Sequence, residues 1–165
     1  MDVHDSRVFR LALTGSVDAA APARATGSID IDAPRTAVWD ALAHVENWPG
    51  IRADITDVRA SGAPVSGGTF TWLAGGVPIT SALALAERPT RLTWANTAPG
   101  VAMACVYELD ELSPHRTRLR CAESMDAATV APHIDHDVLA GNIRSWIEGL
   151  RTFVEVDRSG AHGSR

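Results

Sequence analysis

The sequence predicts an α+β domain in which one curved antiparallel sheet of about seven strands wraps around a long C-terminal helix. Three observations support this fold class. Short alternating segments recur along the middle of the chain, turns rich in glycine and proline separate them, and a long amphipathic helix follows. A sheet with one apolar face and a helix with one apolar stripe bury those surfaces best against each other, with the helix in the concave face of the sheet.

The segment after the first strand predicts a short helix. Residues 28–32 alternate polar and apolar side chains, as a half-buried strand does. Pro34 suits the first helical turn, which leaves its N–H groups unpaired, and apolar residues recur at helical spacing up to Val45. Residues 48–50, Trp-Pro-Gly, end this region, which is therefore one short helix or two helices separated by a kink.

Six further strands and a long helix follow. The strands are expected at residues 55–60, 69–73, 77–87, 92–96, 101–112 and 116–123. A helix over about residues 132–156 ends the domain, because its apolar residues recur every three or four positions. These residues are Leu139, Ile143, Trp146, Leu150 and Phe153. Gly141 and Gly149 lower the stability of this helix, and would allow another segment or a ligand to approach it closely.

The chain divides into an arm, one domain and a tail. Residues 1–25 form an N-terminal arm in which Phe9, Leu11 and Leu13 alternate with other residues, so a short extra strand is one expectation. Residues 26–157 form the ligand-binding domain, and the small, polar residues 158–165 are expected to be a flexible tail. A chain of 165 residues is long enough for one such domain to bury a core.

Composition argues against several classes of partner. The chain has a formal net charge of −5 and no dense group of basic residues, which argues against nucleic acid binding. Its apolar stretches are too short to span a membrane. It opens without the charged and apolar regions of a secretory signal, so we expect a cytoplasmic protein. Cys105 and Cys121 fall on neighbouring strands, and in a reducing compartment we expect two buried free thiols rather than a disulfide bond.

Several segments resemble the polyketide cyclase/dehydrase branch of the START-like (SRPBCC) superfamily. They are residues 33–42 (APRTAVWDAL) with 47–49 (NWP), then 68–72 (GTFTW), 79–81 (ITS), 89–94 (PTRLTW) and 123–124 (ES). The resemblance covers roughly residues 26–156 and depends on the order and spacing of these segments. It implies the helix-grip fold, a cavity for an apolar or aromatic small molecule, and cofactor-free cyclisation or dehydration by proton transfer.

One strand departs from that branch. Relatives often read His-x-Trp where this chain has Cys105-Val106-Tyr107. If the histidine does acid–base work in those relatives, this chain must use another group or do no such chemistry.

Glu123 is the sharpest catalytic candidate. Residues on a strand alternate between faces, and with its neighbouring arginine residues facing water, Glu123 points inward toward aromatic side chains. An apolar pocket raises the pKa of a carboxyl group, which suits a general acid or base near neutral pH. The alternative is a structural glutamate that bonds a backbone N–H or an arginine, or that faces water. Tyr107 would polarise a ligand carbonyl, or serve only as a core aromatic residue.

The same alternation, with the helix stripe, predicts the residues that line the cavity. They are Trp72, Trp94, Asn96, Met103, Cys105, Cys121, His136, Asn142 and Trp146. Asn96 would orient a ligand oxygen, although a turn residue is the competing interpretation. His136 and Asn142 flank Leu139 on the helix and would lie at the cavity mouth, with His136 as an acid–base partner of Glu123. The tryptophan residues would otherwise simply fill the core.

We expect neither a metal ion nor a cofactor. His133, His136 and Asp137 would lie on one side of a helix, yet no further ligand group in the sequence completes a metal site. There is no glycine-rich phosphate loop, nucleophile elbow or catalytic triad spacing.

Two other functions are open on the sequence alone. The same cavity would serve a non-catalytic carrier of a hydrophobic ligand, which the cysteine in place of histidine at position 105 favours. A third interpretation is a partner-binding module. In it, the small residues Ala82, Ala84 and Ala86 on the outer sheet face would allow two copies to pack as a homodimer.

Overall fold

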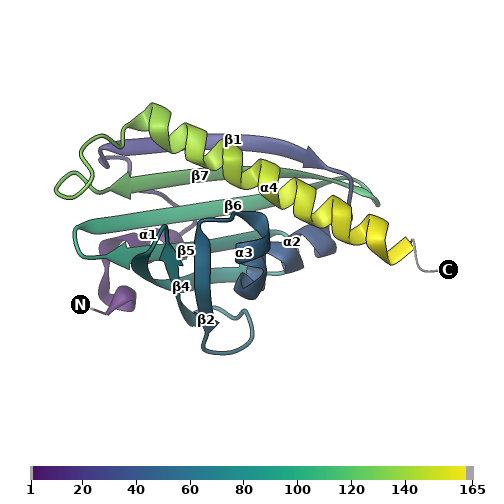
Figure 1. Ribbon diagram of the computed structural model, residues 1–165, viewed down its shortest axis with the longest axis horizontal. Helices are drawn as coiled ribbons and strands as arrows, with labels where there is room; N and C mark the ends of the chain where they lie inside the picture. The colour runs from purple at the N-terminus through teal and green to yellow at the C-terminus, as the bar shows by residue number, and fades with distance from the viewer. Residues whose placement is uncertain (1, 163–165) are drawn as a thin grey trace.

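A seven-stranded antiparallel sheet with one long helix across its concave face dominates the computed structural model, which describes residues 2–162 (Figure 1). The strands are β1 (Ala23–Ile31), β2 (Ile55–Ala60), β3 (Thr69–Ala74), β4 (Val77–Glu87), β5 (Arg91–Ala98), β6 (Val101–Ser113) and β7 (Arg116–Asp126). The helix is α4 (His136–His162). The strand order is β1-β7-β6-β5-β4-β3-β2, and the predicted α+β helix-grip arrangement is confirmed.

Strand β1 closes the sheet at its far edge, although it comes first in the chain. It pairs along its whole length with β7, so that Ala25 lies opposite Glu123. The remaining strands follow one another as hairpins from β2 to β7. Because β1 begins at Ala23, the compact domain starts three residues before the boundary that the sequence suggested at residue 26.

Two short helices link β1 to β2 and carry the chain across one end of the sheet. They are α2 (Arg35–Ala43) and α3 (Trp48–Ile51), with a single 3-10 turn, η2 (Val45–Asn47), between them. The prediction of two helices separated by a kink is therefore the correct one of the two alternatives. Pro49 lies in the first turn of α3, where a missing N–H group is tolerated.

The main core lies between the concave sheet face and α4. The apolar stripe of α4 is buried there, including Leu139, Ile143 and Leu150. Burying side chains of this size contributes about 1.5–3 kcal/mol each. Gly149 permits close packing, since a Cβ atom at that position would lie 2.3 Å from the carbonyl oxygen of Ile51. Gly141 has no neighbour within 4 Å of such an atom.

The N-terminal arm is helical, so the expectation of a strand there is wrong. A 3-10 turn η1 (Val3–Asp5) is followed by α1 (Arg7–Leu13). The hydroxyl oxygen of Ser6 caps α1 by accepting a hydrogen bond from the N–H of Phe9 at 3.1 Å. Val8, Phe9 and Ala12 are buried at helical spacing. In the same segment Phe9, Leu11 and Leu13 also alternate with other residues, which misled the period-two interpretation.

The arm covers the outer face of the sheet. Val3, Val8, Phe9 and Ala12 pack against buried alanine residues of β4, β5 and β6, namely Ala82, Ala84, Ala95 and Ala104. The Thr93 hydroxyl donates a hydrogen bond to the Ala12 carbonyl at 2.7 Å. Ala82 and Ala84 are therefore not available for the homodimer packing that the sequence suggested. Ala86 turns toward the inner core, because a β-bulge shifts the register between Leu83 and Ala86.

Part of the expected tail is helical. Residues 158–162 continue α4, and the flexibility of residues 158–165 stays a prediction. Residues 163–165 of that prediction lie outside the described residues. Within the described part of the chain, no helix is long and apolar enough to cross a membrane.

Candidate functional site

A cavity of about 450 Å³ opens between the concave face of the sheet, α3 and the first turns of α4. Its walls are mainly aromatic and aliphatic, with a few polar groups that point inward. The lining residues are Trp48, Arg52, Ile55, Trp72, Ala74, Val77, Ile79, Trp94, Asn96, Pro99, Val101, Met103, Cys105, Glu123, Met125, Ala127, Val130, Ala131, Ile134, Leu139, Asn142 and Trp146. An apolar cavity with few polar groups is the usual form of a small-molecule site.

Glu123 carries the single carboxyl group of this lining, and the residue is 8% exposed. It lies on β7 opposite Cys105 of β6. Its Oε2 atom accepts a hydrogen bond from the hydroxyl group of Tyr107. Oε1 has no partner among the described residues and is therefore available to a ligand.

Tyr107 supports Glu123 from behind and does not line the cavity. It is fully buried, and its ring stacks on the indole of Trp94 with centroids 4.7 Å apart. The sequence predicted that the Tyr107 hydroxyl would contact a ligand carbonyl. In the structure that hydroxyl donates its hydrogen bond to Glu123 instead. Tyr107 is thus a positioning residue, held by Trp94 on one face.

Burial raises the pKa of Glu123 above its ordinary value. The hydrogen bond from Tyr107 and the positive charge of Arg52 act in the opposite direction, and burial outweighs both. The carboxyl group therefore holds its proton to a higher pH than a solvated glutamate does. A group that exchanges its proton closer to neutral pH is suited to proton transfer.

A chain of buried hydrogen bonds fixes the orientation of Asn96. The indole Nε1 of Trp72 donates to Oγ of Ser81 at 2.9 Å, and Ser81 donates to Oδ1 of Asn96 at 2.7 Å. The amide NH2 group consequently points away from Ser81, and its hydrogen-bond partners among the described residues are the sulfur atoms of Met103 and Cys105, each at 3.8 Å. Sulfur is a weak hydrogen-bond acceptor, so the Asn96 NH2 group can still donate to a stronger acceptor, such as a ligand oxygen.

Two predicted ligand-binding residues lie outside the cavity lining. Cys121 lies opposite Tyr107 in the sheet, and a Cβ atom at Gly27 would come within 3.3 Å of its sulfur. His136 is exposed at the start of α4, where its Nδ1 is 2.8 Å from the backbone nitrogen of Arg24. This histidine attaches the helix to β1 and is not an acid–base partner of Glu123. Because His136 lies in the first turn of α4, its side chain reaches the edge strand β1.

The other predicted residues do meet in the cavity. Trp72, Trp94, Asn96, Met103, Cys105, Asn142 and Trp146 all contribute to its lining. The buried indole nitrogens of Trp94 and Trp146 have no hydrogen-bond partner within the described chain. Unpaired buried donors are uncommon in folded proteins, and here two of them belong to the walls of one cavity.

Sequence reasoning missed Trp48, Ser81 and Arg52. Trp48 is central, since its ring lies between 5.2 and 5.6 Å from those of Phe70, Trp72, Trp94 and Trp146. Its Nε1 donates a hydrogen bond to the Leu42 carbonyl at 2.9 Å, which ties the start of α3 to α2. The family resemblance pointed toward Trp48 through residues 47–49 and toward Ser81 through residues 79–81, whereas no sequence signal marked Arg52.

The two cysteines are free and buried. Burial raises the pKa of Cys105 well above its ordinary value and that of Cys121 to about 12. Thiolates are the reactive form of cysteine, so neither thiol is activated as a nucleophile. The sheet register sets the two cysteines diagonally, because Cys105 faces Glu123 and Cys121 faces Tyr107.

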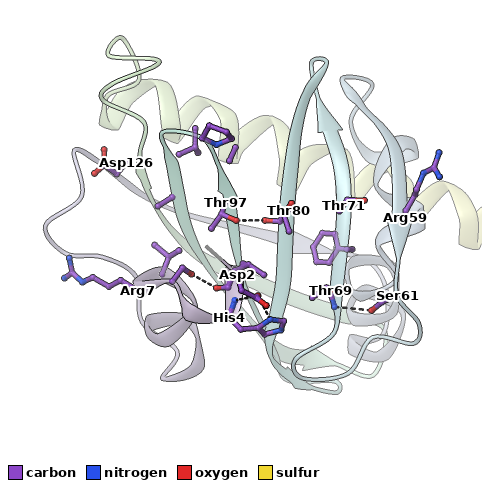
Figure 2. Close-up of a pocket in the computed structure, with 18 of the residues that line it drawn as sticks. Asp2, His4, Arg7, Arg59, Ser61, Thr69, Thr71, Thr80, Thr97 and Asp126 are labelled. Atoms are coloured by element: carbon purple, nitrogen blue, oxygen red, sulfur yellow. Dashed lines mark hydrogen bonds and ion pairs between the residues drawn. The ribbon is translucent and has the colours of Figure 1, made fainter.

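A second, larger hollow of about 1140 Å³ lies on the outer side of the sheet beside the N-terminal arm (Figure 2). Figure 2 shows Thr97, Thr80 and Thr71 side by side across β5, β4 and β3. Its charged residues are mostly exposed and paired, as in the contact of His4 with Asp2 at 2.8 Å. Unlike the inner cavity, this hollow has no buried acid among its lining residues. In the described chain, no group of three or more His, Cys, Asp or Glu residues could hold a metal ion.

No protein-family model and no curated protein sequence matches this chain. Solved structures do resemble it. A START superfamily protein from Mycobacterium smegmatis has a TM-score of 0.67 at 10% identity, covering 80% of this chain and 97% of its own. The Helicobacter pylori protein jhp0584 has a TM-score of 0.67 at 13% identity, covering 82% of this chain and 90% of its own.

The di-domain ARO/CYC protein BexL, from the BE-7585A biosynthetic pathway, has a TM-score of 0.64 at 23% identity. That match covers 80% of this chain and 46% of BexL, so this chain spans about half the length of the two-domain protein. The sheet order, the position of α4 and these neighbours agree with one another. The chain therefore has the helix-grip fold that START superfamily proteins share.

Proposed function

We propose that this protein binds an apolar or aromatic ketone in the inner cavity and catalyses cofactor-free proton transfer on it, of the kind that drives cyclisation or dehydration. The observation that carries this proposal is the buried carboxyl group of Glu123 in an aromatic cavity wall, with Oε2 held by Tyr107 and Oε1 without a hydrogen-bond partner among the described residues. BexL, which shares this fold, is an ARO/CYC protein of a biosynthetic pathway, and that likeness supports the cyclisation chemistry of the proposal.

Glu123 and Asn96 supply complementary groups for enolisation. Ionised Glu123 takes a proton from the carbon beside the ligand carbonyl, while the Asn96 NH2 group donates a hydrogen bond to the oxygen that gains negative charge. In a dehydration, Glu123 then returns that proton to the hydroxyl group that leaves as water, as the C–O bond breaks and a C=C bond forms. The sheet register places the two Cα atoms about 12 Å apart on one face, so a ligand of two fused rings can contact both side chains.

A carrier without catalysis is the second candidate. The observation that favours it is Cys105, whose buried thiol cannot act as an acid near neutral pH. Among the described residues, the cavity lining therefore has no histidine and no second carboxyl group beside Glu123, and a carrier needs only the aromatic walls.

Hydrogen–deuterium exchange into 2-tetralone, a bicyclic ketone, separates the two candidates. We expect the wild-type protein to accelerate exchange beside the carbonyl, as followed by NMR. Glu123→Gln should lower the rate by about 10²-fold or more while the dissociation constant changes little. Glu148→Gln, an exposed glutamate on α4, is the matched control and should behave as wild type. Binding of 2-tetralone without accelerated exchange would overturn the enzyme and support the carrier. LC–MS of solvent extracts from freshly purified protein then gives the class of any retained ligand.

A further inference from the structure

We propose that the ligand of this cavity carries a carboxylate group, and that the guanidinium group of Arg52 binds it at the cavity opening. This inference rests on the proposed function above, because it concerns the same cavity, and it adds the class of ligand. It concerns a residue that sequence reasoning did not select.

Arg52 is the one positively charged residue in the cavity lining. Glu123 is the one negatively charged candidate there, and burial favours its uncharged form. The remaining lining residues are apolar or neutral. When Glu123 holds its proton, Arg52 is therefore the one charged group of the lining, and its counter-ion Asp54 lies outside the lining.

Two contacts fix the plane of the Arg52 guanidinium group. Nε donates a hydrogen bond to Oδ1 of Asp54 at 2.5 Å. The guanidinium carbon lies 5.9 Å from the centre of the Trp146 ring, within cation–π range. An arginine held in this way loses less conformational freedom when it binds a ligand than a free side chain would.

The rest of the guanidinium group is unoccupied. Neither Nη atom has a hydrogen-bond partner among the described residues, since the bond to Asp54 uses Nε alone. Its side chain is 29% exposed, which places it where the cavity meets solvent. The planar fork of two Nη groups matches the two oxygens of a carboxylate, and such bonds are about twice as strong as neutral ones.

The charge of the whole molecule does not favour an anion. The chain carries a formal net charge of −5, so long-range attraction would bring a cation and not a carboxylate. A preference for an anionic ligand would therefore have to come from Arg52 itself. This makes the contribution of one residue measurable.

The test compares 2-naphthoate with its neutral analogue 2-naphthamide by isothermal titration calorimetry in low-salt buffer at pH 7. We expect the wild-type protein to bind 2-naphthoate about tenfold or more tightly than 2-naphthamide. Arg52→Gln should remove that preference and leave 2-naphthamide affinity within about twofold. Circular dichroism verifies that the variant is folded, and Arg52→Lys, which keeps the charge without the fork, should fall between the two.

Arg59→Gln is the matched control. Arg59 lies on β2, is 76% exposed, and its Nε bonds Asp57 at 3.1 Å, an arrangement like that of Arg52 with Asp54 but outside the inner cavity. Its loss should leave the preference for 2-naphthoate intact. Asp54→Asn should strengthen 2-naphthoate binding several-fold, because it removes a competing anion. A purely structural role of the ion pair would not produce this gain.

The outcomes separate the two proposals. If both probes bind wild type equally, the carboxylate inference is overturned and the apolar cavity stands. If the preference survives in Arg52→Gln, another group binds the anion and the inference is again wrong. If neither probe binds wild-type protein, both the inference and the proposed small-molecule function are overturned.

Discussion

Tyr107 donates its hydroxyl hydrogen to Oε2 of Glu123 from a position that no ligand can reach. The tyrosine is fully buried and its ring stacks on Trp94. The carboxyl group is therefore oriented by the core, and one of its oxygens stays free. The acid is preorganised before any ligand arrives, which is a general requirement of efficient sites.

Removing this hydrogen bond should raise the pKa of Glu123 further. The Tyr107 hydroxyl lowers that pKa, because it stabilises the carboxylate form. In Tyr107→Phe we expect the midpoint of carboxyl titration to move to higher pH, as measured by NMR of protein labelled at glutamate side-chain carbons. The ring stack on Trp94 is kept, so the loss of stability should be limited to about 1 kcal/mol. A downward move of the midpoint would show that the hydroxyl group does not stabilise the charged form.

The stability of the protein should depend on pH through Glu123. Its pKa in the folded state lies above the ordinary value of 4.5. Above that value the unfolded chain releases this proton first, the native state binds more protons, and stability falls as pH rises toward the folded-state pKa. Glu123→Gln lacks this titrating group. The difference between its urea midpoint and that of wild type should therefore shift in favour of the variant as pH rises from 4 to 8. Glu148→Gln should track wild type throughout, and a constant difference for Glu123→Gln would contradict the raised pKa.

Gly149 and Gly141 form a matched pair on α4. Alanine is favoured over glycine in a helix by about 1 kcal/mol, and Gly141→Ala should gain most of that, since nothing lies within 4 Å of the new atom. Gly149→Ala should instead destabilise by about 1–3 kcal/mol, because its Cβ would meet the Ile51 carbonyl oxygen at 2.3 Å. Thermal unfolding of both variants measures this contrast. Equal gains would mean that α3 and α4 are not in close contact.

Phe9 should stabilise the fold although it lies in the N-terminal arm. It is 7% exposed and packs in the cluster that covers the outer face of the sheet. We expect Phe9→Ala to cost about 3 kcal/mol of unfolding free energy. Leu13→Ala, at a position 43% exposed on the same helix, should cost less than about 0.5 kcal/mol. Similar midpoints for both variants in urea would show that the arm is not docked.

Ser81 should matter for ligand binding without touching the ligand. Its hydroxyl group accepts from Trp72 and donates to Asn96. In Ser81→Ala, two buried polar atoms lose their partner, at about 1–3 kcal/mol each. Freed from this constraint, the Asn96 amide should bind a ketone less well, so 2-tetralone affinity should fall relative to a hydrocarbon of the same shape, such as tetralin. An equal fall for tetralin would point to general loosening of the cavity.

The architecture was predictable because its patterns are long. Strand β4 matches the expected range of 77–87, and α4 shows its apolar stripe over several turns. The inward direction of Trp94, Cys105 and Glu123 follows from strand alternation, which the register confirms. Such signals hold wherever one face of an element is consistently buried.

The wrong or missing predictions concern segments whose sequence pattern is short, and side chains whose direction is set by tertiary contacts. Over seven residues, the apolar positions of α1 satisfy both a helical and an alternating period, and Ser6 as a helix cap was the signal that could have decided between them. His136 has the spacing of a cavity residue but lies at a helix start that docks on Arg24. Arg52 has no sequence signal, because its role comes from a neighbour on a distant helix, Trp146.

The aromatic cluster around Trp48 gives this protein an optical property of its own. Four of its five tryptophans have rings in contact there, while Trp39 lies elsewhere with its Nε1 on the Arg91 carbonyl. Neighbouring indoles share their excited states, so their near-ultraviolet circular dichroism depends on the angles between the rings. Three of these rings form the cavity walls together with Trp48 itself. We therefore expect a ligand in the cavity to change the near-ultraviolet spectrum of the native chain, so that occupancy can be measured without a label.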